Sequence, residues 1–544
     1  MSKLPRPFRI ILRVLLVLSL IALSLGAVGG AMWLSDAVHE RTYVEKEIPD
    51  YNPTKPIPAE ALKEDFAITR GAIEDEHGDP YIYTPKEELS AMFDAAYAQL
   101  NKPMSEIEFV KLTGPIIHAV HDGHTNLSLP EVFGDSYVYE VPIFPAVSYL
   151  EKDRVLVWND GTSQGSLPRG SEIISIDGEP VNALVQRITD LFVSTDGYTS
   201  AAARQELQGE EDLRSRFATY LAYLKNFPET YDVTFRAPAG TERTAQVRGE
   251  QVRDIFDTIQ ERYPPSVTDA DELGTHEEDE AVTRLHWEGD VPVLTIDSFN
   301  DGSFDEYAAA LERAFTKIQE RNASDLVIDL RDNGGGAPGR GWLLLKYFGK
   351  VDIPVLSRLE VRAFQSRYAR YSSSSPWKDR MSHLLYQLLF TERTEGGIWV
   401  GRDVTLTTAV TSPFPPYEDL PEITPSPFEG HTFLLLSGQT FSSGSEFASL
   451  AKTYLESLTV VGQETMGTST ALVTELFTNL ILPNTRLELR VPLARLDYVG
   501  TEGRERGRGV LPDVEVWPTF EDASEDRDRV MERALELIKD EPPE

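Results

Sequence analysis

The chain has 544 residues, of which 41% are hydrophobic and 26% are charged, so it is large and apolar enough for about three or four globular domains. Acidic residues outnumber basic ones by 88 to 52, and the formal charge of −36 argues against binding to nucleic acid or to anionic lipid through the bulk of the surface. Because the chain has no cysteine, it has no disulfide, no thiolate metal site and no cysteine nucleophile.

The N-terminal residues carry several basic side chains and then an uncharged, apolar stretch at 14–34. About 20 apolar residues span a bilayer as a helix, and flanking cations stay on the cytoplasmic side. Residues 1–39 are therefore predicted to be either a transmembrane signal anchor or a cleaved signal peptide. The rest of the chain would lie in the cell envelope, either anchored to the inner membrane or exported to the periplasm. It would touch the membrane through this segment only.

Two further regions come before the catalytic candidates. After a proline-rich linker at 40–58, apolar side chains recur at helical spacing and predict an N-terminal helical domain over 59–128. Short β-type runs then alternate with turns over 135–255. Within them, LPRGSEIISIDGEPV resembles the strand and Asp-Gly turn of a PDZ domain, which binds an extended peptide along a sheet edge. The resemblance implies a PDZ-like domain, and an ordinary β-hairpin is the alternative.

An acidic linker at 268–282 separates these regions from a βα pattern over 283–520. The buried-type strands VPVLTIDSF and DLVIDL are each followed by a helical pattern, which predicts a largely parallel sheet covered by helices. Residues 359–412 interrupt this pattern and are interpreted as an insertion or lid. The charged amphipathic stretch within 521–544 predicts a C-terminal helix.

Two turns inside the βα pattern can carry chemistry. The strand TFLLL leads into FSSGSE, so several serines stand where a helix begins. Serines at this position usually cap the helix, but a nucleophile there would be exposed, and its developing negative charge would lie near free helix amides. The second turn, RDNGGG, places Gly334, Gly335 and Gly336 in a row, which lets backbone amides approach a ligand closely.

The two turns, together with GHT upstream and GVLPDVEV near the end, resemble the tail-specific, or C-terminal-processing, serine peptidases and the related tricorn core protease. The resemblance covers roughly residues 105–515. It implies an α/β fold with a catalytic domain of the ClpP/crotonase type. The PDZ-like, β-rich domain and the N-terminal helical domain would accompany it, behind the transmembrane or signal segment.

The same resemblance implies roles for residues of the two turns. Ser443, three residues before Glu446, would be the nucleophile, with Ser445 and Ser442 as the alternatives. The backbone amides of Gly444 and Gly335 would form the oxyanion hole that stabilises the tetrahedral intermediate.

At the position of the catalytic base, this sequence differs from the tail-specific pattern. Thr468 stands where that branch has a lysine, and Lys452 lies too far along the predicted helix to reach Ser443. Histidine is the remaining base near neutral pH. The tricorn-type branch places its histidine in the stretch that aligns with GHT, so the resemblance points to His124 and to a Ser-His rather than a Ser-Lys enzyme.

Other ionisable groups remain as alternatives. His121 is an alternative base, and the tricorn-type branch implies a distal glutamate, for which Glu505 is preferred and Glu502 is the alternative. Asp122, between the histidines, is typical of a turn. The three histidines of HAVHDGHT could suggest a metal site, but no matching set of Cys, His or Glu accompanies them. No metal and no cofactor are therefore expected.

The predicted function is that of a serine endopeptidase that hydrolyses proteins or peptides through an acyl-enzyme. The PDZ-like domain would recognise the substrate, with the C-terminus of the substrate as one candidate feature. Two alternatives stay open: a non-catalytic protein that binds peptides or hydrophobic ligands on the same fold, and an esterase or other acyl hydrolase. The chain lacks the GxSxG motif of the common α/β-hydrolases.

Overall fold

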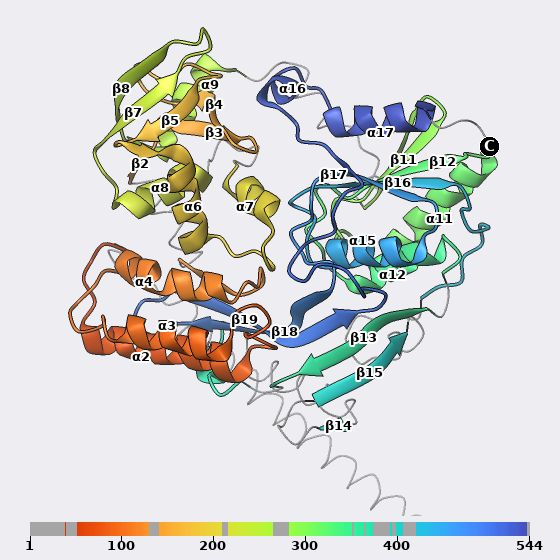
Figure 1. Ribbon diagram of the computed structural model, residues 1–544, viewed down its shortest axis with the longest axis horizontal. Helices are drawn as coiled ribbons and strands as arrows, with labels where there is room; N and C mark the ends of the chain where they lie inside the picture. Colours follow the sequence, from red (N-terminus) through yellow and green to blue (C-terminus); the bar gives the residue numbers. More distant parts are fainter. Residues whose placement is uncertain are drawn as a thin grey trace, which may run out of the picture.

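The computed structural model of the chain describes residues 39, 52–129, 141–208, 216–264, 282–350, 353–363, 366–373, 392–393, 399–405 and 420–540. A group of helices, a β-rich unit and an α/β domain surround one long pair of strands (Figure 1). The predicted anchor and the predicted acidic linker lie outside the described residues, apart from the last residue of each. Within the described ranges, no helix is both long enough and apolar enough to cross a bilayer.

The helices near the N-terminus do not form a core of their own. They are α2 (Ala59–Gly71), the π-helical turn η2 (Ala72–Glu76), α3 (Lys86–Tyr97) and α4 (Glu106–Ala119). At the start of α4, Ser105 and Glu108 form a reciprocal capping box, which satisfies two otherwise free amides. The apolar faces of these helices pack on leucines and valines of two long strands near the C-terminus. The helices therefore depend on a distant part of the chain for their stability.

The β-rich unit contains an antiparallel sheet in the order β3-β4-β5-β7-β8, with β6 beside β5. Its strands are β2 (Pro142–Ile143), β3 (Ala146–Leu150), β4 (Val155–Asp160), β5 (Glu172–Ile176), β6 (Glu179–Pro180), β7 (Thr230–Arg236), β8 (Glu242–Arg248) and β9 (Glu250–Gln251). Its helices are α6 (Val181–Phe192), α7 (Ser200–Leu207), α8 (Arg216–Lys225) and α9 (Val252–Arg262). The turn between β5 and β6 is formed by Asp177 and Gly178, both with positive φ, as the IDG sequence predicts.

The α/β domain contains the sheet β10-β11-β12-β16-β17-β20, which is parallel from β11 onwards. Its strands are β10 (Arg284–Glu288), β11 (Val291–Thr295), β12 (Asp325–Asp329), β16 (His431–Leu436), β17 (Leu458–Gly462) and β20 (Val514–Glu515). Side chains of the central strands alternate between two apolar cores. Helices α11 (Phe304–Glu320), α12 (Pro338–Lys346) and α15 (Ser443–Tyr454) cover one face, and α17 (Arg529–Asp540), preceded by the short α16 (Phe520–Ser524), covers the other.

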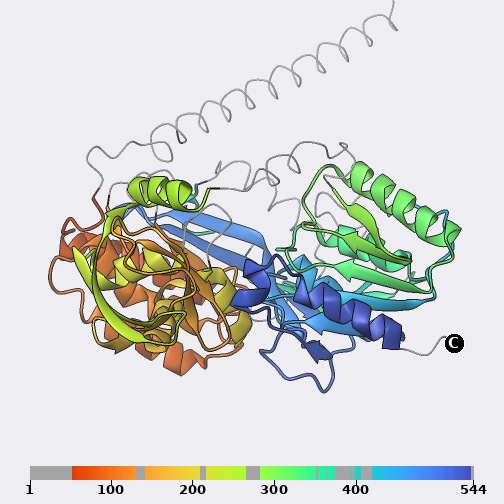
Figure 2. The same cartoon turned by 90° about the horizontal axis from the view of Figure 1, so that it is seen from above.

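A second sheet joins the α/β domain to the N-terminal helices. Its long hairpin is formed by β18 (Ala471–Ile481) and β19 (Glu488–Tyr498), and Figure 2 shows these strands running between the two halves of the molecule. Its other strands are β1 (Asn126–Ser128), β13 (Pro354–Val361), β14 (Glu392–Arg393) and β15 (Trp399–Thr405). Strands β13 to β15 therefore place much of the described part of the predicted insertion in a sheet. Strand β1 pairs with β19, which brings the histidine motif just before β1 to this hairpin.

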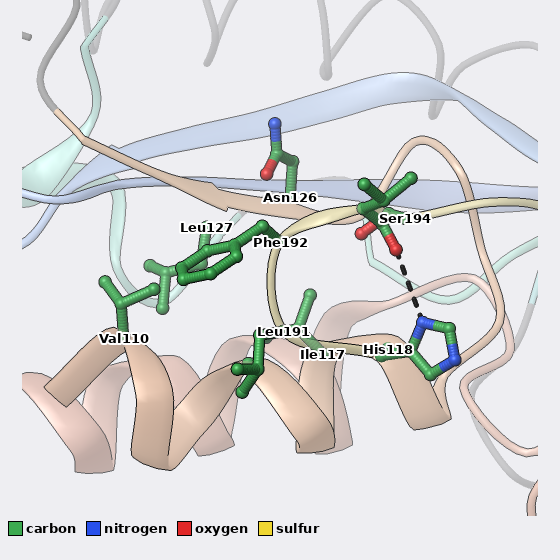
Figure 3. Close-up of a pocket in the computed structure, with 10 residues that line it drawn as sticks. Val110, Ile117, His118, Asn126, Leu127, Leu191, Phe192 and Ser194 are labelled. Atoms are coloured by element: carbon green, nitrogen blue, oxygen red, sulfur yellow. Dashed lines mark hydrogen bonds between the residues drawn. The ribbon is translucent and has the colours of Figure 1, made fainter. Parts of the chain in front are cut away.

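The β-rich unit docks on α4. Figure 3 shows a narrow crevice in which Val110 and Ile117 of α4 face Leu191 and Phe192 at the end of α6. At one end of the crevice, His118 Nδ1 lies 3.3 Å from the carbonyl oxygen of Val193. The unit therefore packs against the helix that leads into the histidine motif.

Candidate active site

The serine turn and the glycine turn meet at the carboxyl edge of the parallel sheet. They follow the neighbouring strands β16 and β12, and loops after adjacent parallel strands share one edge, where ligands bind in such folds. The hydroxyl of Thr440 donates to the carbonyl of Leu330 at 2.8 Å, and the amide of Phe441 donates to the carbonyl of Asn333 at 3.0 Å. These bonds are local consequences of the strand order, and they hold the two turns in one rigid edge.

Ser442 has a backbone conformation that few side chains adopt. Its φ is 50° and its ψ is −124°, immediately before the first residue of α15. Gly335, with φ of 104°, lies directly against it, and a Cβ at Gly335 would lie 2.6 Å from the Cβ of Ser442. Strained backbone of this kind persists where the surrounding structure holds it, and it clusters at functional sites. The glycine turn is therefore shaped to the serine that it faces.

The three serines of the turn point in different directions. The hydroxyl of Ser443 donates to the carbonyl of Gly336 at 2.6 Å, and that of Ser445 donates to the carbonyl of Thr440 at 2.8 Å. The hydroxyl of Ser442 instead lies 3.2 Å from His124 Nε2. The structure thus brings the predicted base to a serine, but to Ser442 rather than to Ser443 or Ser445. The reason is that Ser443 is already the first helical residue, so its side chain turns back to the glycine turn.

Two aromatic rings lie close to the imidazole of His124. It stacks on Phe441 with 4.4 Å between ring centroids, and Phe477 of β18 lies 5.7 Å away. The side chain is buried, so the imidazole lies largely out of bulk water. Phe441, the residue before Ser442, thus packs directly against this imidazole.

Asp122 is the carboxylate beside this base. Its Oδ1 accepts the His124 amide at 3.1 Å and lies 3.7 Å from His124 Nδ1. Its Oδ2 accepts from Thr125 Oγ1 at 2.5 Å and lies 2.9 Å from His77 Nε2. Because His77 Nδ1 accepts the amide of Asp79 at 3.1 Å, neutral His77 carries its proton on Nε2 and donates it to Asp122.

The charge state of Asp122 follows from these bonds. Burial raises the pKa of Asp122, but the hydrogen bonds from His124 and His77 outweigh it and hold the pKa below its usual value. An ionised carboxylate therefore lies 3.7 Å from Nδ1 of His124.

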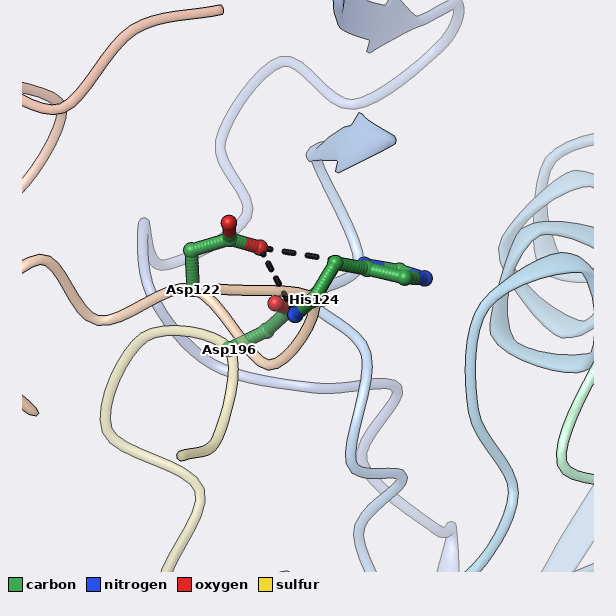
Figure 4. A group of neighbouring side chains, drawn as sticks. All are labelled: Asp122, His124 and Asp196. Carbon is green, nitrogen blue, oxygen red and sulfur yellow. Dashed lines mark hydrogen bonds and ion pairs between the residues drawn. The ribbon is translucent and has the colours of Figure 1, made fainter. Parts of the chain in front are cut away.

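A second carboxyl group, that of Asp196, reaches this cluster from the loop after α6 (Figure 4). Its Oδ1 accepts the amide of Gly123 at 2.6 Å. Burial, and then the charge of Asp122, raise the pKa of Asp196 well above its usual value. Ligand atoms of Asp122, His124 and Asp196 lie within 4.8 Å of one another, close enough to hold a small cation. A proton on Asp196 would reduce the repulsion between the two neighbouring carboxyl groups, as a bound cation would.

The remaining predicted candidates make other contacts. His121 Nδ1 lies 2.9 Å from the carbonyl oxygen of Gly197, so it faces the β-rich unit. The Glu505 side chain is 72% exposed and lies 3.9 Å from Arg508, and Glu502 is also exposed. Within the described residues, no hydrogen bond or ion pair joins either glutamate to His124.

The lysine alternative has no support from the geometry. Lys452 Nζ donates to the carbonyl of Leu511 at 2.8 Å and to Asp513 at 2.9 Å, at the far end of α15 from Ser442. Thr468, which stands in place of the lysine, is fully buried and donates its hydroxyl to the carbonyl of Ala471.

The amides near Ser442 differ in what they are free to bind. The amide of Gly335 donates to Asn333 Oδ1 and that of Gly444 donates to the carbonyl of Phe441, both at 2.9 Å. Among the backbone hydrogen bonds of the described residues, none has the amide of Ser443 or of Gly336 as donor. Phe299 bonds to the residues on either side of Gly336, so the Gly336 amide and carbonyl point the opposite way, toward Ser443.

Some contributors to this site were not predicted. Asn333 belongs to the glycine turn, where its side chain bonds the Gly335 amide and the carbonyl of Ile296. Its position in RDNGGG was the available signal. For Asp122, the signal was an acid two residues before the histidine. His77 and Asp196 are far from the motif in sequence, and nothing in their local sequence marks them.

The domain that carries both turns resembles known proteins. The model of peptidase family S41 matches residues 290–516, which include both turns. The α/β domain of this chain belongs to peptidase family S41. This S41 membership makes the chain a serine-type peptidase that acts on proteins or peptides, and it favours neither the carrier nor the esterase alternative. No curated protein matches the sequence.

Solved structures extend the comparison beyond the S41 domain. Mature CPAF shares the fold with a TM-score of 0.53 at 15% identity, over 89% of this chain and 99% of CPAF. A putative peptidase from Parabacteroides merdae has a TM-score of 0.42 at 13% identity, over 88% of this chain and 96% of its own. The photosystem II D1 C-terminal processing protease has a TM-score of 0.35 at 15% identity, over 84% of this chain and 93% of its own. The last two scores are too low to support an argument.

Proposed function

We propose that this S41 peptidase uses Ser442 as nucleophile and His124 as base, in a Ser-His mechanism. His124 Nε2 takes the hydroxyl proton as Ser442 attacks the peptide carbonyl, and the imidazolium then gives that proton to the leaving amine. Water enters with the same histidine as base and releases the acyl group from Ser442. The observation that carries the proposal is the 3.2 Å separation of Nε2 and Oγ.

Asp122 and two backbone amides complete the proposed machinery. The ionised carboxylate of Asp122 stabilises the imidazolium that forms on His124 during attack. The free amides of Ser443 and Gly336 would hold the oxyanion, because the amides of Gly335 and Gly444 already donate within the turns. The nucleophile and the oxyanion donors thus all lie one residue away from the positions that the motif implies.

Substitution of single serines tests the proposal. Ser442→Ala should abolish both peptide turnover and covalent labelling by a fluorophosphonate. Ser443→Ala should keep labelling, at a reduced rate, because it loses only the hydrogen bond to the Gly336 carbonyl. The matched pair differs by one position on the same turn, so a general loss of folding would affect both. Labelling that survives in Ser442→Ala and disappears in Ser443→Ala would overturn the assignment.

We further propose that the β-rich unit acts as a PDZ-like module for the substrate and that residues 1–39 place the peptidase in the cell envelope. The support is the strand and Asp-Gly turn of β5 and β6, and the uncharged stretch at 14–34 behind its basic residues. Membrane fractionation of the full chain and of a chain lacking residues 1–39 tests the second part. Equal solubility of the two would contradict it.

A further inference from the structure

Arg490 lies close to the proposed base without touching it. It stands on β19 and pairs across the sheet with Asn126 of β1, directly after the histidine motif. Its guanidinium carbon lies 3.9 Å from the ring centroid of Phe477, and that ring lies 5.7 Å from the ring of His124. Phe477 therefore separates a positive charge from the base by a single aromatic ring.

Arg490 also lacks the acidic partner that other arginines of this region have. Arg331 pairs with Asp329 and Arg508 pairs with Glu464. Within the described residues, no hydrogen bond or ion pair involves the side chain of Arg490, although acids exceed bases by 36 charges in this chain. Its side chain is exposed to solvent. A guanidinium that is fixed on an aromatic ring and left unpaired is prepared to bind an external anion.

We propose that Arg490 binds a carboxylate of the substrate, an inference that rests on the proposed Ser442–His124 chemistry. The guanidinium offers paired donors that match a carboxylate in geometry and charge. An extended peptide advances roughly 3.3–3.6 Å per residue, so this carboxylate belongs to a residue a few positions from the scissile bond. Its source is either the C-terminus of the substrate or an Asp or Glu side chain.

Asn126 adds a second polar group at the same place. Residues directly opposite each other on antiparallel strands project from the same face, with Cβ atoms roughly 4.5–5.5 Å apart. The Asn126 side chain is exposed, at the edge of the crevice that Leu191 and Phe192 also line (Figure 3). Its amide can therefore donate to a carboxylate held by Arg490.

The competing role for Arg490 is to offset the buried charge of Asp122, whose field it feels. The two roles differ in how they depend on the substrate. A residue that acts only through Asp122 affects the cleavage of every peptide equally. A carboxylate anchor affects only peptides that carry the carboxylate.

The experiment compares internally quenched peptides that share one cleavable core. One peptide has a free C-terminus, one has a C-terminal amide, and further amides carry single Glu or Gln residues on either side of the cleaved bond. Wild type should cleave one carboxylate-bearing peptide about ten- to a hundredfold better in kcat/KM than its uncharged counterpart. The free-acid and the glutamate peptides distinguish the C-terminus from a side chain as the source.

Arg490→Gln should remove this preference while leaving fluorophosphonate labelling of Ser442 and hydrolysis of the uncharged peptide unchanged. Arg490→Glu should shift preference toward a lysine at the same substrate position. Arg533→Gln, on α17, is the control for loss of one arginine. The proposal is overturned if wild type ignores the carboxylate or if Arg490→Gln slows all peptides equally. Absence of labelling and turnover in wild type would instead overturn the proposed peptidase mechanism.

Discussion

The nucleophile side and the base side of the site are built in different ways. Ser442 and the glycine turn lie on loops after adjacent parallel strands of one domain, and backbone hydrogen bonds join them. The loop of His124 is held by groups from separate parts of the chain. His77, after η2, contacts Asp122, Asp196 of the β-rich unit accepts the Gly123 amide, and Phe477 on β18 lies beside the His124 ring. The nucleophile thus depends on the folding of one domain, whereas the base depends on the docking of three units.

This difference has a functional consequence. The S41 domain alone can place the serine and the proposed oxyanion amides, but the residues that match the family begin at 290 and do not include His124, the proposed base. The β19 strand, which pairs with β1, and the loop of Asp196 must both be in place for His124 to reach Ser442. Loss of domain docking should therefore lower the catalytic activity more than it disturbs the fold of the S41 domain.

The largest predicted effect comes from a substitution beside His124, the proposed base. Asp122→Asn keeps the size of the side chain but removes the negative charge beside His124 Nδ1, so kcat should fall by about 10²- to 10⁴-fold. Asp190→Asn, at a carboxylate that is 45% exposed on α6, serves as the control and should leave kcat unchanged. Full activity of Asp122→Asn would exclude a role for this carboxylate.

The next largest effect comes from a substitution in the glycine turn beside Ser442. At Gly335, whose φ is 104°, an added Cβ would lie 2.6 Å from the Cβ of Ser442. Gly335→Ala should therefore displace the serine, lower kcat by about a hundredfold or more and reduce the free energy of unfolding by roughly 1–3 kcal/mol. Gly334→Ala is the matched control, since a Cβ there would meet no atom within 4 Å. Kinetics and thermal unfolding of the pair should differ, and identical behaviour would contradict the close fit of the two turns.

The smallest effect on the rate is expected at Asp196, where two substitutions differ in the groups that they keep. Asp196→Asn reproduces a protonated carboxyl, with an oxygen for the Gly123 amide and a donor toward Asp122, so activity should stay near that of wild type. Asp196→Ala lacks both groups, lets the histidine loop move and should lower kcat by about a hundredfold.

The pH dependence of stability provides a second readout at Asp196. Its pKa is raised in the folded chain, so the folded state binds this proton more tightly than the unfolded state does. The associated stability is complete below the ordinary value of 3.8 and is lost as pH rises through the raised pKa. Wild type should therefore lose more thermal stability with rising pH than Asp196→Asn does. Parallel curves for the two would argue against a proton on Asp196.

Much of the fold could be predicted from the sequence because it follows from local patterns. Alternating apolar runs and helical stripes predicted the parallel sheet, and the IDG sequence predicted a turn that needs positive φ. The two catalytic turns were recognisable from residue type alone. The long hairpin of β18 and β19 was not predicted, and it is the element that carries the histidine motif to the S41 domain.

On the nucleophile side, the proposed Ser442 is one residue from the predicted Ser443, and on the base side the structure adds carboxylates that the sequence did not indicate. Successive side chains turn by about 100° at the start of a helix, so neighbouring serines face different partners. Glu505 followed from resemblance to the tricorn-type branch, whereas Asp122 is the acid that lies beside the imidazole. Asp196 and His77 could not be foreseen, because no local pattern links them to His124.

The sequence by itself determined which residue types stand at the two turns, that Thr468 stands where the tail-specific pattern has a lysine, and that the central sheet is parallel. These features follow from strand and helix periodicity and from the conformational freedom of glycine. Only the tertiary structure decided which serine meets the imidazole, which acid supports it and which arginine stays unpaired near it. Those outcomes depend on strand pairing and domain docking over hundreds of residues, and such contacts leave no local pattern in the chain.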